Sequence, residues 1–199
     1  ISRETLQDNY QIKTIAKSLE SKIKKELEKM LKNDRENYEK FFKDFGMQLK
    51  VGIYESYGMA KETLQDLLLF YSSKEKKMVT LSEYVSNMND DDKTIYYACG
   101  ETIDKIDLLP QVESAKEKGI DILYLTDYLD EFVFKVMMNY KEKNFVNVAS
   151  SDANFESEEE KNELNKVNEE YKDMFIKMHD ALNNGVNEVE FTHRLKNHP

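Results

Sequence analysis

The first residues of the chain place a cation where a helix begins. Ser2 is a typical helix cap, Glu4 suits a first helical turn, and the apolar positions start at Leu6. Arg3 therefore lies next to the positive end of the helix dipole, where a cation is unfavourable by roughly a few tenths of a kcal/mol. Two interpretations are open: Arg3 is a solvated surface residue, or it points together with the helix N-terminus at an anion.

Other chemically capable residues have simple structural explanations. Cys99 is the single cysteine and lies in the apolar run IYYACG with no histidine following nearby, which favours a packed thiol over a nucleophile. It excludes an internal disulfide and is compatible with a reducing compartment. The acidic run NDDDK, residues 89–93, could attract a divalent cation but is more simply a solvated turn. His179, His193 and His198 have no metal-ligand grouping, so no metal site is expected.

The composition indicates an acidic globular protein. The chain has 199 residues, enough for one or two small domains, with 34% charged and 40% hydrophobic residues. A net charge of -10 opposes binding to nucleic acid, whose phosphates would be repelled. No apolar run approaches the length of a membrane span, and no signal peptide opens the chain.

The first third of the chain has helical periodicity. Residues 4–32 carry apolar side chains at spacings of three and four, which predicts one long amphipathic helix. A second helix begins near Tyr38 and runs to Ile53 through two glycines, and its aromatic stripe is expected to form core. A third is expected from Gly58 to Tyr71. Three helices with short connections predict a helical coil or small bundle.

The pattern changes near residue 72. Residues 80–83, TLSE, form a capping box and predict a short helix ending near Met88. The segments 94–100, 120–126 and 144–150 are continuous in apolar and β-branched residues, as buried strands are. Helices are expected between them, one running from Pro110 to Gly119 and one from Asp130 to Tyr140. This β-α-β-α-β order predicts a small α-β-α sandwich with a parallel sheet and helices on both faces. No nucleotide-binding glycine motif is present.

The last fifty residues differ in composition. Residues 150–162 are acidic and polar and are typical of a linker. An amphipathic helix from Leu164 to Leu182 and a short strand at 187–195 are expected to follow. The abrupt ends predict a piece of a longer protein.

Several stretches together resemble the ninety-kilodalton heat-shock chaperone family, whose bacterial members are of the HtpG type. The opening SRETLQDN resembles the family's SREMLQ loop. The stretches that agree in order and spacing are FGMQLKVGIYE, LLLFYSSK, TLSEYVSNM, KTIYYACGE, KGIDILYLTDYLDEF and VNEVEFTHRL. The resemblance covers essentially the whole chain. It implies a helical coil (1–71) and a small sandwich (72–150) from the family's middle domain, then the linker and first helix and strand of its C-terminal domain (151–199).

The resemblance gives Arg3 a role. In the family this arginine contacts the γ-phosphate of ATP held in a separate N-terminal domain, and a glutamine four residues on supports it. The matching residues are Arg3 and Gln7, which lie one turn apart on the same helical face. Such an arginine supplies charge to a phosphoryl-transfer transition state. Gln7 could equally be an exposed helix amide. The resemblance implies ATP with magnesium as cofactor of the full-length protein, whereas the isolated chain is expected neither to bind ATP well nor to hydrolyse it.

The sequence departs from the family around residue 130. Tyr128 replaces a usual proline, Phe132 stands where bacterial members often carry tryptophan, and Lys135 where asparagine is common. In the family this region faces the cleft for client proteins. An adaptable apolar surface for unfolded chains could therefore be formed by Glu131, Phe132, Phe134 and Met138. The alternative is that most of these side chains pack on the sheet.

The resemblance also implies partners: client proteins, the protein's own N-terminal ATPase domain and its C-terminal dimerisation domain. The full-length protein is expected to be a cytoplasmic homodimer, and the isolated chain a monomer. Two other classes stay open. A stand-alone acidic helical adaptor would explain the charge and the helices. A small α/β enzyme would use Cys99 or the acidic run, although the sequence offers no paired base and nucleophile.

Overall fold

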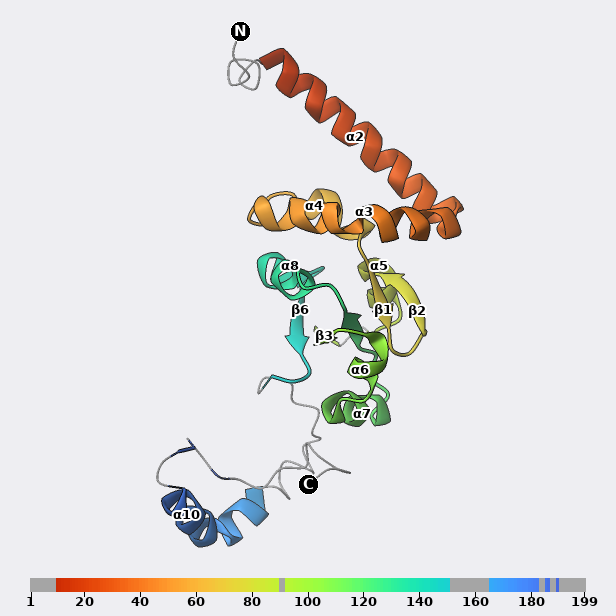
Figure 1. Ribbon diagram of the computed structural model, residues 1–199. Helices are drawn as coiled ribbons and strands as arrows, with labels where there is room; N and C mark the ends of the chain where they lie inside the picture. Colours follow the sequence, from red (N-terminus) through yellow and green to blue (C-terminus); the bar gives the residue numbers. More distant parts are fainter. Residues whose placement is uncertain (1–9, 90–91, 151–164, 183–184, 187–188, 190–199) are drawn as a thin grey trace.

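The computed structural model describes residues 10–89, 92–150, 165–182, 185–186 and 189 (Figure 1). Arg3, Gln7 and the strand expected at 187–195 therefore lie outside the described residues, apart from position 189. The described part is mixed α/β, with helices first and then a sheet with helices between its strands. No helix in these ranges is both long and apolar enough to cross a membrane.

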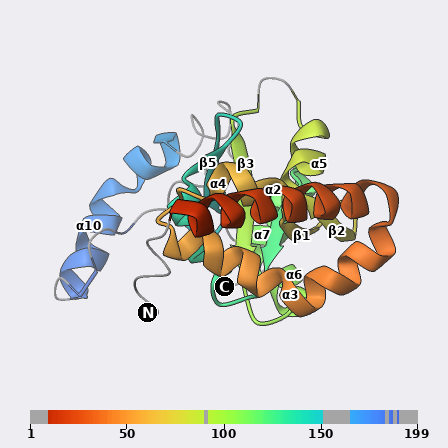
Figure 2. The ribbon, with the colours of Figure 1, turned by 90° about the horizontal axis from the view of Figure 1, so that it is seen from above.

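Two long helices open the described chain. They are α2 (Tyr10–Asn33) and α3 (Arg35–Glu55). In Figure 1 they diverge from the short connection that joins them, and in Figure 2, seen from above, α2 lies over part of α3. Only the C-terminal end of α2 is covered, so Leu27 is its one buried residue. The predicted helix is confirmed from Tyr10 onward. The apolar side chains that its period places on one face, from Ile12 to Ile23, are exposed.

The aromatic stripe of α3 forms core, as predicted, over its first turns. Tyr38 and Phe42 are buried, and the Tyr38 hydroxyl donates to the carbonyl of Leu67 at 2.5 Å. The helix passes through Gly46 without a break, and a Cβ there would lie 2.9 Å from the Phe42 ring. Phe45, farther along, is half exposed.

The predicted third helix is wrong beyond residue 67. Helix α4 (Lys61–Leu64) and a 3-10 turn, η1 (Gln65–Leu67), are followed by strand β1 (Leu69–Ser72). A second strand, β2 (Lys77–Thr80), pairs antiparallel with β1, and neither strand was predicted. A short apolar run cannot be assigned to helix or strand by periodicity alone, which explains the error. The capping box that follows is confirmed and opens α5 (Leu81–Ser86).

The sheet is six-stranded and mixed, in the order β2-β1-β4-β3-β6-β5. Its parallel centre is the predicted one: β3 (Thr94–Cys99) lies between β4 (Leu123–Leu125) and β6 (Lys143–Asn147). The prediction of an all-parallel sheet is corrected by antiparallel strands at both edges. At one edge β5 (Asn139–Tyr140) returns into β6 through two left-handed residues, the signature of a tight hairpin turn.

Side chains of the central strands alternate between two hydrophobic clusters. Tyr97, Leu123 and Leu125 belong to the larger cluster, which includes residues of α3, α5 and α8 (Asp130–Met137). Ala98 and Tyr124 belong to the smaller cluster beside α6 (Ile103–Asp107) and α7 (Pro110–Glu117). Because successive strand residues point to opposite faces, both faces of the sheet centre are covered. Helix α7 starts at its proline and is followed by Gly119 in the left-handed conformation, as predicted.

The last described helix is α10 (Lys172–Ala181). Residues 165–170 are also helical, and a turn at Tyr171 interrupts the single helix expected there. None of the residues of α10 is buried.

Candidate functional site

Helix α8 presents two different faces. Val133, Phe134 and Met137 are buried, whereas Phe132 is 50% exposed and Met138, just after the helix, is 72% exposed. This division follows the helical period of a helix lying on a sheet. Three of the four predicted client-contact residues, Glu131 included, therefore reach the surface.

Phe134 lies in the core instead. Its ring stacks on Phe145 with centroids 4.1 Å apart, and it meets Phe70 and Tyr97 edge-on at 4.9 and 5.2 Å. It is 1% exposed. Phe134 therefore packs on the sheet, which was the alternative left open by the sequence, and it is not part of the exposed surface.

A charged pair borders the exposed phenylalanine. Glu131 and Lys135 are one helical turn apart, with Oε1 and Nζ 3.1 Å from each other. The Lys135 ammonium also lies 5.8 Å from the centre of the Phe132 ring. Exposed pairs of this kind contribute only about 0.3–0.5 kcal/mol, so their main effect is to hold charge beside an apolar side chain.

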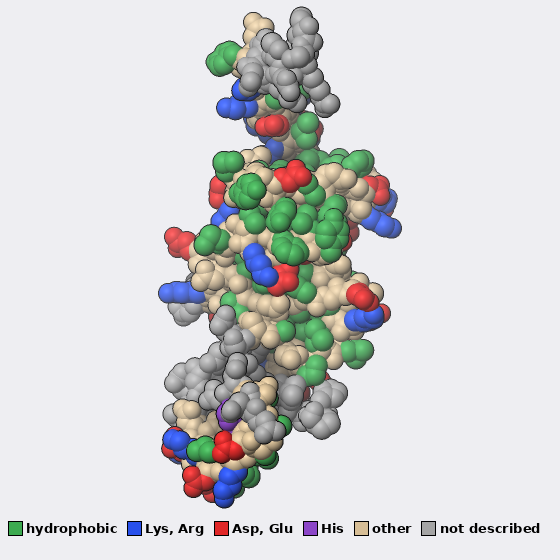
Figure 3. All heavy atoms as spheres, turned by 60° about the vertical axis from the view of Figure 1, so that its left-hand side comes forward, with side chains coloured by type: hydrophobic (Ala, Val, Ile, Leu, Met, Phe, Trp, Pro, Cys, Tyr) green, Lys and Arg blue, Asp and Glu red, His purple; other side chains and the backbone are tan. Residues whose placement is uncertain are grey.

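The apolar surface continues onto α3 and the turn that follows it. The Tyr54 ring meets Phe132 edge-on with centroids 6.1 Å apart. Tyr57 and Met59, between α3 and α4, are 89% and 85% exposed. Figure 3 shows hydrophobic side chains gathered over the face that carries α4 and α8, with charged side chains among and around them. We call Tyr54, Tyr57, Met59, Phe132 and Met138 the apolar face.

A buried lysine fixes the start of α8. The Lys50 ammonium on α3 lies 2.5 Å from Asp127 and 2.5 Å from Asp130. It also lies 5.4 Å from the centre of the Phe70 ring. Burial raises the pKa of the Asp130 carboxyl, and the charge of Lys50 opposes that shift. The Asp130 carboxylate also accepts a hydrogen bond from the Asp127 backbone N–H at 3.0 Å. Asp130 is in the first turn of α8, where negative charge suits the helix dipole.

A second lysine fixes the end of α8. Lys61, the first residue of α4, donates to the carbonyl of Met137 at 2.9 Å and to the side-chain oxygen of Asn139 at 3.1 Å. Next to it, a Cβ on Gly58 would lie 3.2 Å from the carbonyl oxygen of Val136. The α3–α4 turn is thus packed directly against the C-terminal end of α8. Sequence reasoning found neither lysine, since their partners lie more than seventy residues away along the chain.

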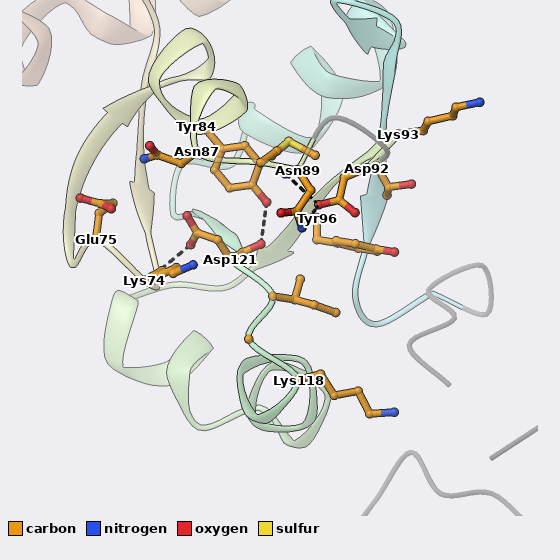
Figure 4. A pocket seen from close by; sticks show the side chains of 14 residues that line it. Lys74, Glu75, Tyr84, Asn87, Asn89, Asp92, Lys93, Tyr96, Lys118 and Asp121 are labelled. Carbon is orange, nitrogen blue, oxygen red and sulfur yellow. Dashed lines mark hydrogen bonds between the residues drawn. The ribbon is translucent and has the colours of Figure 1, made fainter. Parts of the chain in front are cut away.

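A polar hollow of about 640 Å³ lies elsewhere, between the β1–β2 turn, α5 and the loop before β4 (Figure 4). Its carboxylates are engaged: Asp121 accepts from the Ser72 and Ser73 hydroxyls, and Asp92 accepts from Asn89. The labelled Lys93 and Lys118 side chains point away from its centre. These bonds hold the Asp121 and Asp92 carboxylates in the turns that line the hollow.

The structure also bears on Cys99 and the acidic run, the other candidates from the sequence. Burial, followed by the charge of Glu131, raises the pKa of the Cys99 thiol to about 12, so the thiol is protonated at neutral pH. Of the acidic run, residues 90 and 91 lie outside the described residues. Within the described ranges, no three His, Cys, Asp or Glu side chains are grouped as metal ligands are. The roles assigned to Arg3 and Gln7 stay predictions.

The fold and the whole sequence define the class of the chain. A family model described as Hsp90 protein matches residues 1–199, so the chain belongs to the Hsp90 family. It is similar to chaperone protein HtpG of Clostridium acetobutylicum (56% identical over 199 residues), Clostridium perfringens strain 13 (54%) and Oceanobacillus iheyensis (51%). Each alignment covers 100% of this chain and 32% of the relative, so the chain spans about a third of the length of the curated relatives it matches.

The family match also decides between the classes left open by the sequence. The adaptor hypothesis requires the ordered family motifs to be coincidental, and a match over all 199 residues removes that basis. The enzyme hypothesis based on Cys99 loses support from the raised thiol pKa.

Proposed function

We propose that this segment binds non-native client proteins through the exposed side of α8, as part of an ATP-dependent chaperone. The observation that carries the proposal is Phe132, which is held half exposed against Tyr54 on a helix fixed at both ends by buried or partly buried lysines. Large exposed apolar groups on a rigid support are typical of protein-binding sites. Glu131 and Met138 lie on the same surface, while Phe134 supports it from below.

We further propose that Arg3 and Gln7 act on nucleotide held elsewhere in the full-length protein. Arg3 would supply positive charge to the γ-phosphate of ATP, and Gln7 would orient it, with magnesium bound together with the nucleotide. This rests on the family membership and on the match of SRETLQ to the family loop. The same membership supports a three-part division at residues 71 and 150, with dimerisation through a C-terminal domain and a cytoplasmic location. The isolated chain is then a monomer without ATPase activity.

Client binding is tested in the full-length protein with a permanently unfolded probe, reduced and carboxymethylated lactalbumin. We expect Phe132→Ala to raise the Kd about tenfold, which is typical of a central apolar contact. The matched control is Leu108→Ala, because Leu108 is 79% exposed between α6 and α7. Equal Kd values for Phe132→Ala and the unsubstituted protein would contradict the proposal.

The arginine role is tested by ATP turnover of the full-length protein with Arg3→Ala. A loss of about 10³-fold in turnover with nucleotide affinity nearly kept is expected if the guanidinium acts in the transition state. Unchanged turnover would mean that Arg3 is a solvated residue at a helix start.

A further inference from the structure

We propose that the α3–α4 turn is the second half of the client-binding surface, with Tyr57 and Met59 contacting an apolar client segment that is flanked by basic residues. This rests on the proposed function of α8. It assigns a role to Tyr57 and Met59, and it names the chemistry of the partner.

The first support is the backbone of the exposed residues themselves. Tyr57 has φ of 52° and Met138 has φ of 63°, so both occupy the left-handed region that bulky residues rarely adopt. Yet these side chains are 89% and 72% exposed and have little packing to compensate. Such conformations persist only where surrounding structure imposes them, and they are concentrated at binding sites.

The second support is that the turn is ordered rather than loose. Its backbone N–H groups are bonded in succession: Tyr57 to the carbonyl of Tyr54, Gly58 to Ile53 and Met59 to Ser56, each at 3.0 Å. The Ser56 hydroxyl then accepts the N–H of the residue that precedes α4, at 3.0 Å. A surface fixed before binding loses little conformational entropy when a partner binds.

The third support is that the two halves adjoin. Gly58 approaches the Val136 carbonyl, Lys61 binds the Met137 carbonyl, and the Tyr54 and Phe132 rings are in contact. Tyr57 and Met138, each one or two residues from these contacts, therefore lie on neighbouring segments. An extended segment could contact Phe132 and the turn at once, since each residue of an extended chain spans about 3.3 Å.

The charge around the apolar face indicates which residues should lie on either side of the apolar segment of the partner. The cations next to the apolar face are engaged: Lys135 pairs with Glu131, and Lys61 donates to the Met137 carbonyl and to the Asn139 side chain. Two exposed carboxylates, Glu55 and Glu62, flank the turn. With a net charge of -10 on the chain, basic residues beside the apolar segment fit this surface and acidic residues are repelled.

The test uses two labelled peptides and the full-length protein. Both carry the core Leu-Phe-Val-Leu-Phe, one with two lysines at each end and one with two glutamates, and fluorescence anisotropy gives their Kd. We expect tighter binding of the lysine peptide, by about tenfold at low salt, with the difference shrinking as salt is added. The double variant Tyr57→Asn/Met59→Ser is expected to raise the Kd for the lysine peptide about tenfold. Asparagine is chosen because it tolerates the left-handed backbone at position 57.

The outcomes separate the two proposals. If Phe132→Ala weakens the lysine peptide and the turn variant does not, the α8 proposal stands and the extension to the turn is overturned. If neither variant changes the Kd, both fail. If the turn variant instead abolishes self-association in ultracentrifugation while peptide binding is kept, the occupant is a second copy and the extension is overturned.

The charge assignment has its own variant. Glu55→Gln/Glu62→Gln should keep the affinity for the apolar core of the peptide and reduce the preference for lysine flanks. An unchanged preference overturns the charge assignment.

Discussion

The ammonium nitrogen of Lys50 lies 2.5 Å from Oδ1 of Asp130, and each side chain is only 3% exposed. That oxygen has no aligned hydrogen bond among the described groups, so it is compensated by the charge of the lysine. The pair joins the C-terminal part of α3 to the first turn of α8. It fixes the helix that carries Phe132, and its removal should therefore affect the whole apolar face.

Replacing Lys50 by methionine leaves a buried carboxylate without its partner. We expect Lys50→Met to lower the free energy of unfolding by about 3–5 kcal/mol, measured by chemical denaturation at neutral pH. Because burial raises the pKa of Asp130, the deficit should shrink as the pH falls toward the ordinary value of 3.8, where the carboxyl is neutral.

Two variants provide the controls. Lys40→Met removes an exposed pair, in which Nζ lies 2.7 Å from Glu36, and should change stability by less than about 0.5 kcal/mol. Adding Asp130→Asn to Lys50→Met removes the uncompensated charge and should restore more than half of the loss. A loss below about 1 kcal/mol for Lys50→Met alone would show that the pair is solvated.

A second ionic contact holds a carboxyl whose pKa is shifted in the opposite direction from that of Asp130. Arg35 holds Glu83 by two bonds of 3.0 Å, and the carboxylate also accepts the Thr80 N–H at 2.7 Å. Burial opposes ionisation of Glu83, but these bonds outweigh it and lower its pKa below the ordinary 4.5. A lowered carboxyl pKa contributes stability above 4.5 that is lost as the pH falls through the folded-state value.

We therefore expect Glu83→Gln to destabilise the protein at pH 7 by about 1 kcal/mol, a modest value because the side chain is half exposed and screened. The difference from the unsubstituted protein should narrow below pH 4.5. Glu39→Gln, which removes a single bond of 3.0 Å to Arg35, is the control and should show a smaller effect at pH 7. A deficit that stayed constant down to acid pH would contradict the role of ionised Glu83.

The parallel centre of the sheet was predictable because its strands are apolar on both faces. Strand β3 places alternate residues in two clusters, so almost every position is apolar, and its segment could be recognised without its neighbours. The capping box at Thr80 was predictable for a similar reason, since its reciprocal bonds to Glu83 are local.

The edge strands and the anchors of α8 were not predictable from local pattern. The run LLLFYS fits a buried helix or a strand equally well until its pairing with β2 and β4 is known. Lys50 looks like an ordinary helix residue, because its partners lie 77 and 80 positions further along the chain. The periodicity of α2 identified its apolar face but could not show that Ile12 to Ile23 would be exposed in this segment.

Two glycines allow the backbone of the α3–α4 turn to be tested. Gly58 and Gly119 both have positive φ, 83° and 75°, but only Gly58 is crowded: a Cβ there would lie 3.2 Å from the Val136 carbonyl, whereas Gly119 has nothing within 4 Å. Alanine at either position should lower the free energy of unfolding by about 1–2 kcal/mol, because its Cβ is strained in a left-handed backbone. We expect Gly58→Ala to cost more than Gly119→Ala in thermal or chemical unfolding, because the α8 end must also move.

The same pair separates stability from binding. Gly58→Ala should weaken binding of the lysine-flanked peptide as well, since it pushes the turn that carries Tyr57 away from the end of α8. Gly119→Ala, on the far side of the sheet, should leave binding unchanged. Equal losses of stability in the two variants would mean that the contact between the turn and α8 is not tight.

The buried and exposed phenylalanines of α8 should respond in opposite ways to truncation. Phe134 is 1% exposed and packs on three aromatic rings, so Phe134→Ala should lower the free energy of unfolding by about 3–5 kcal/mol. Phe132 is 50% exposed and contacts one aromatic ring. Phe132→Ala should therefore lower the free energy of unfolding by less than about 1 kcal/mol, while it weakens binding of the unfolded probe.

Denaturant unfolding and probe binding measured on both variants decide the assignment. Phe134→Leu keeps most of the core volume and should retain probe binding close to that of the unsubstituted protein, which shows that this position acts through packing. A large stability loss for Phe132→Ala would instead place its ring in the core and move client contact away from α8. Loss of probe binding in a well-folded Phe134→Leu protein would mean that the buried ring becomes exposed when a client is bound.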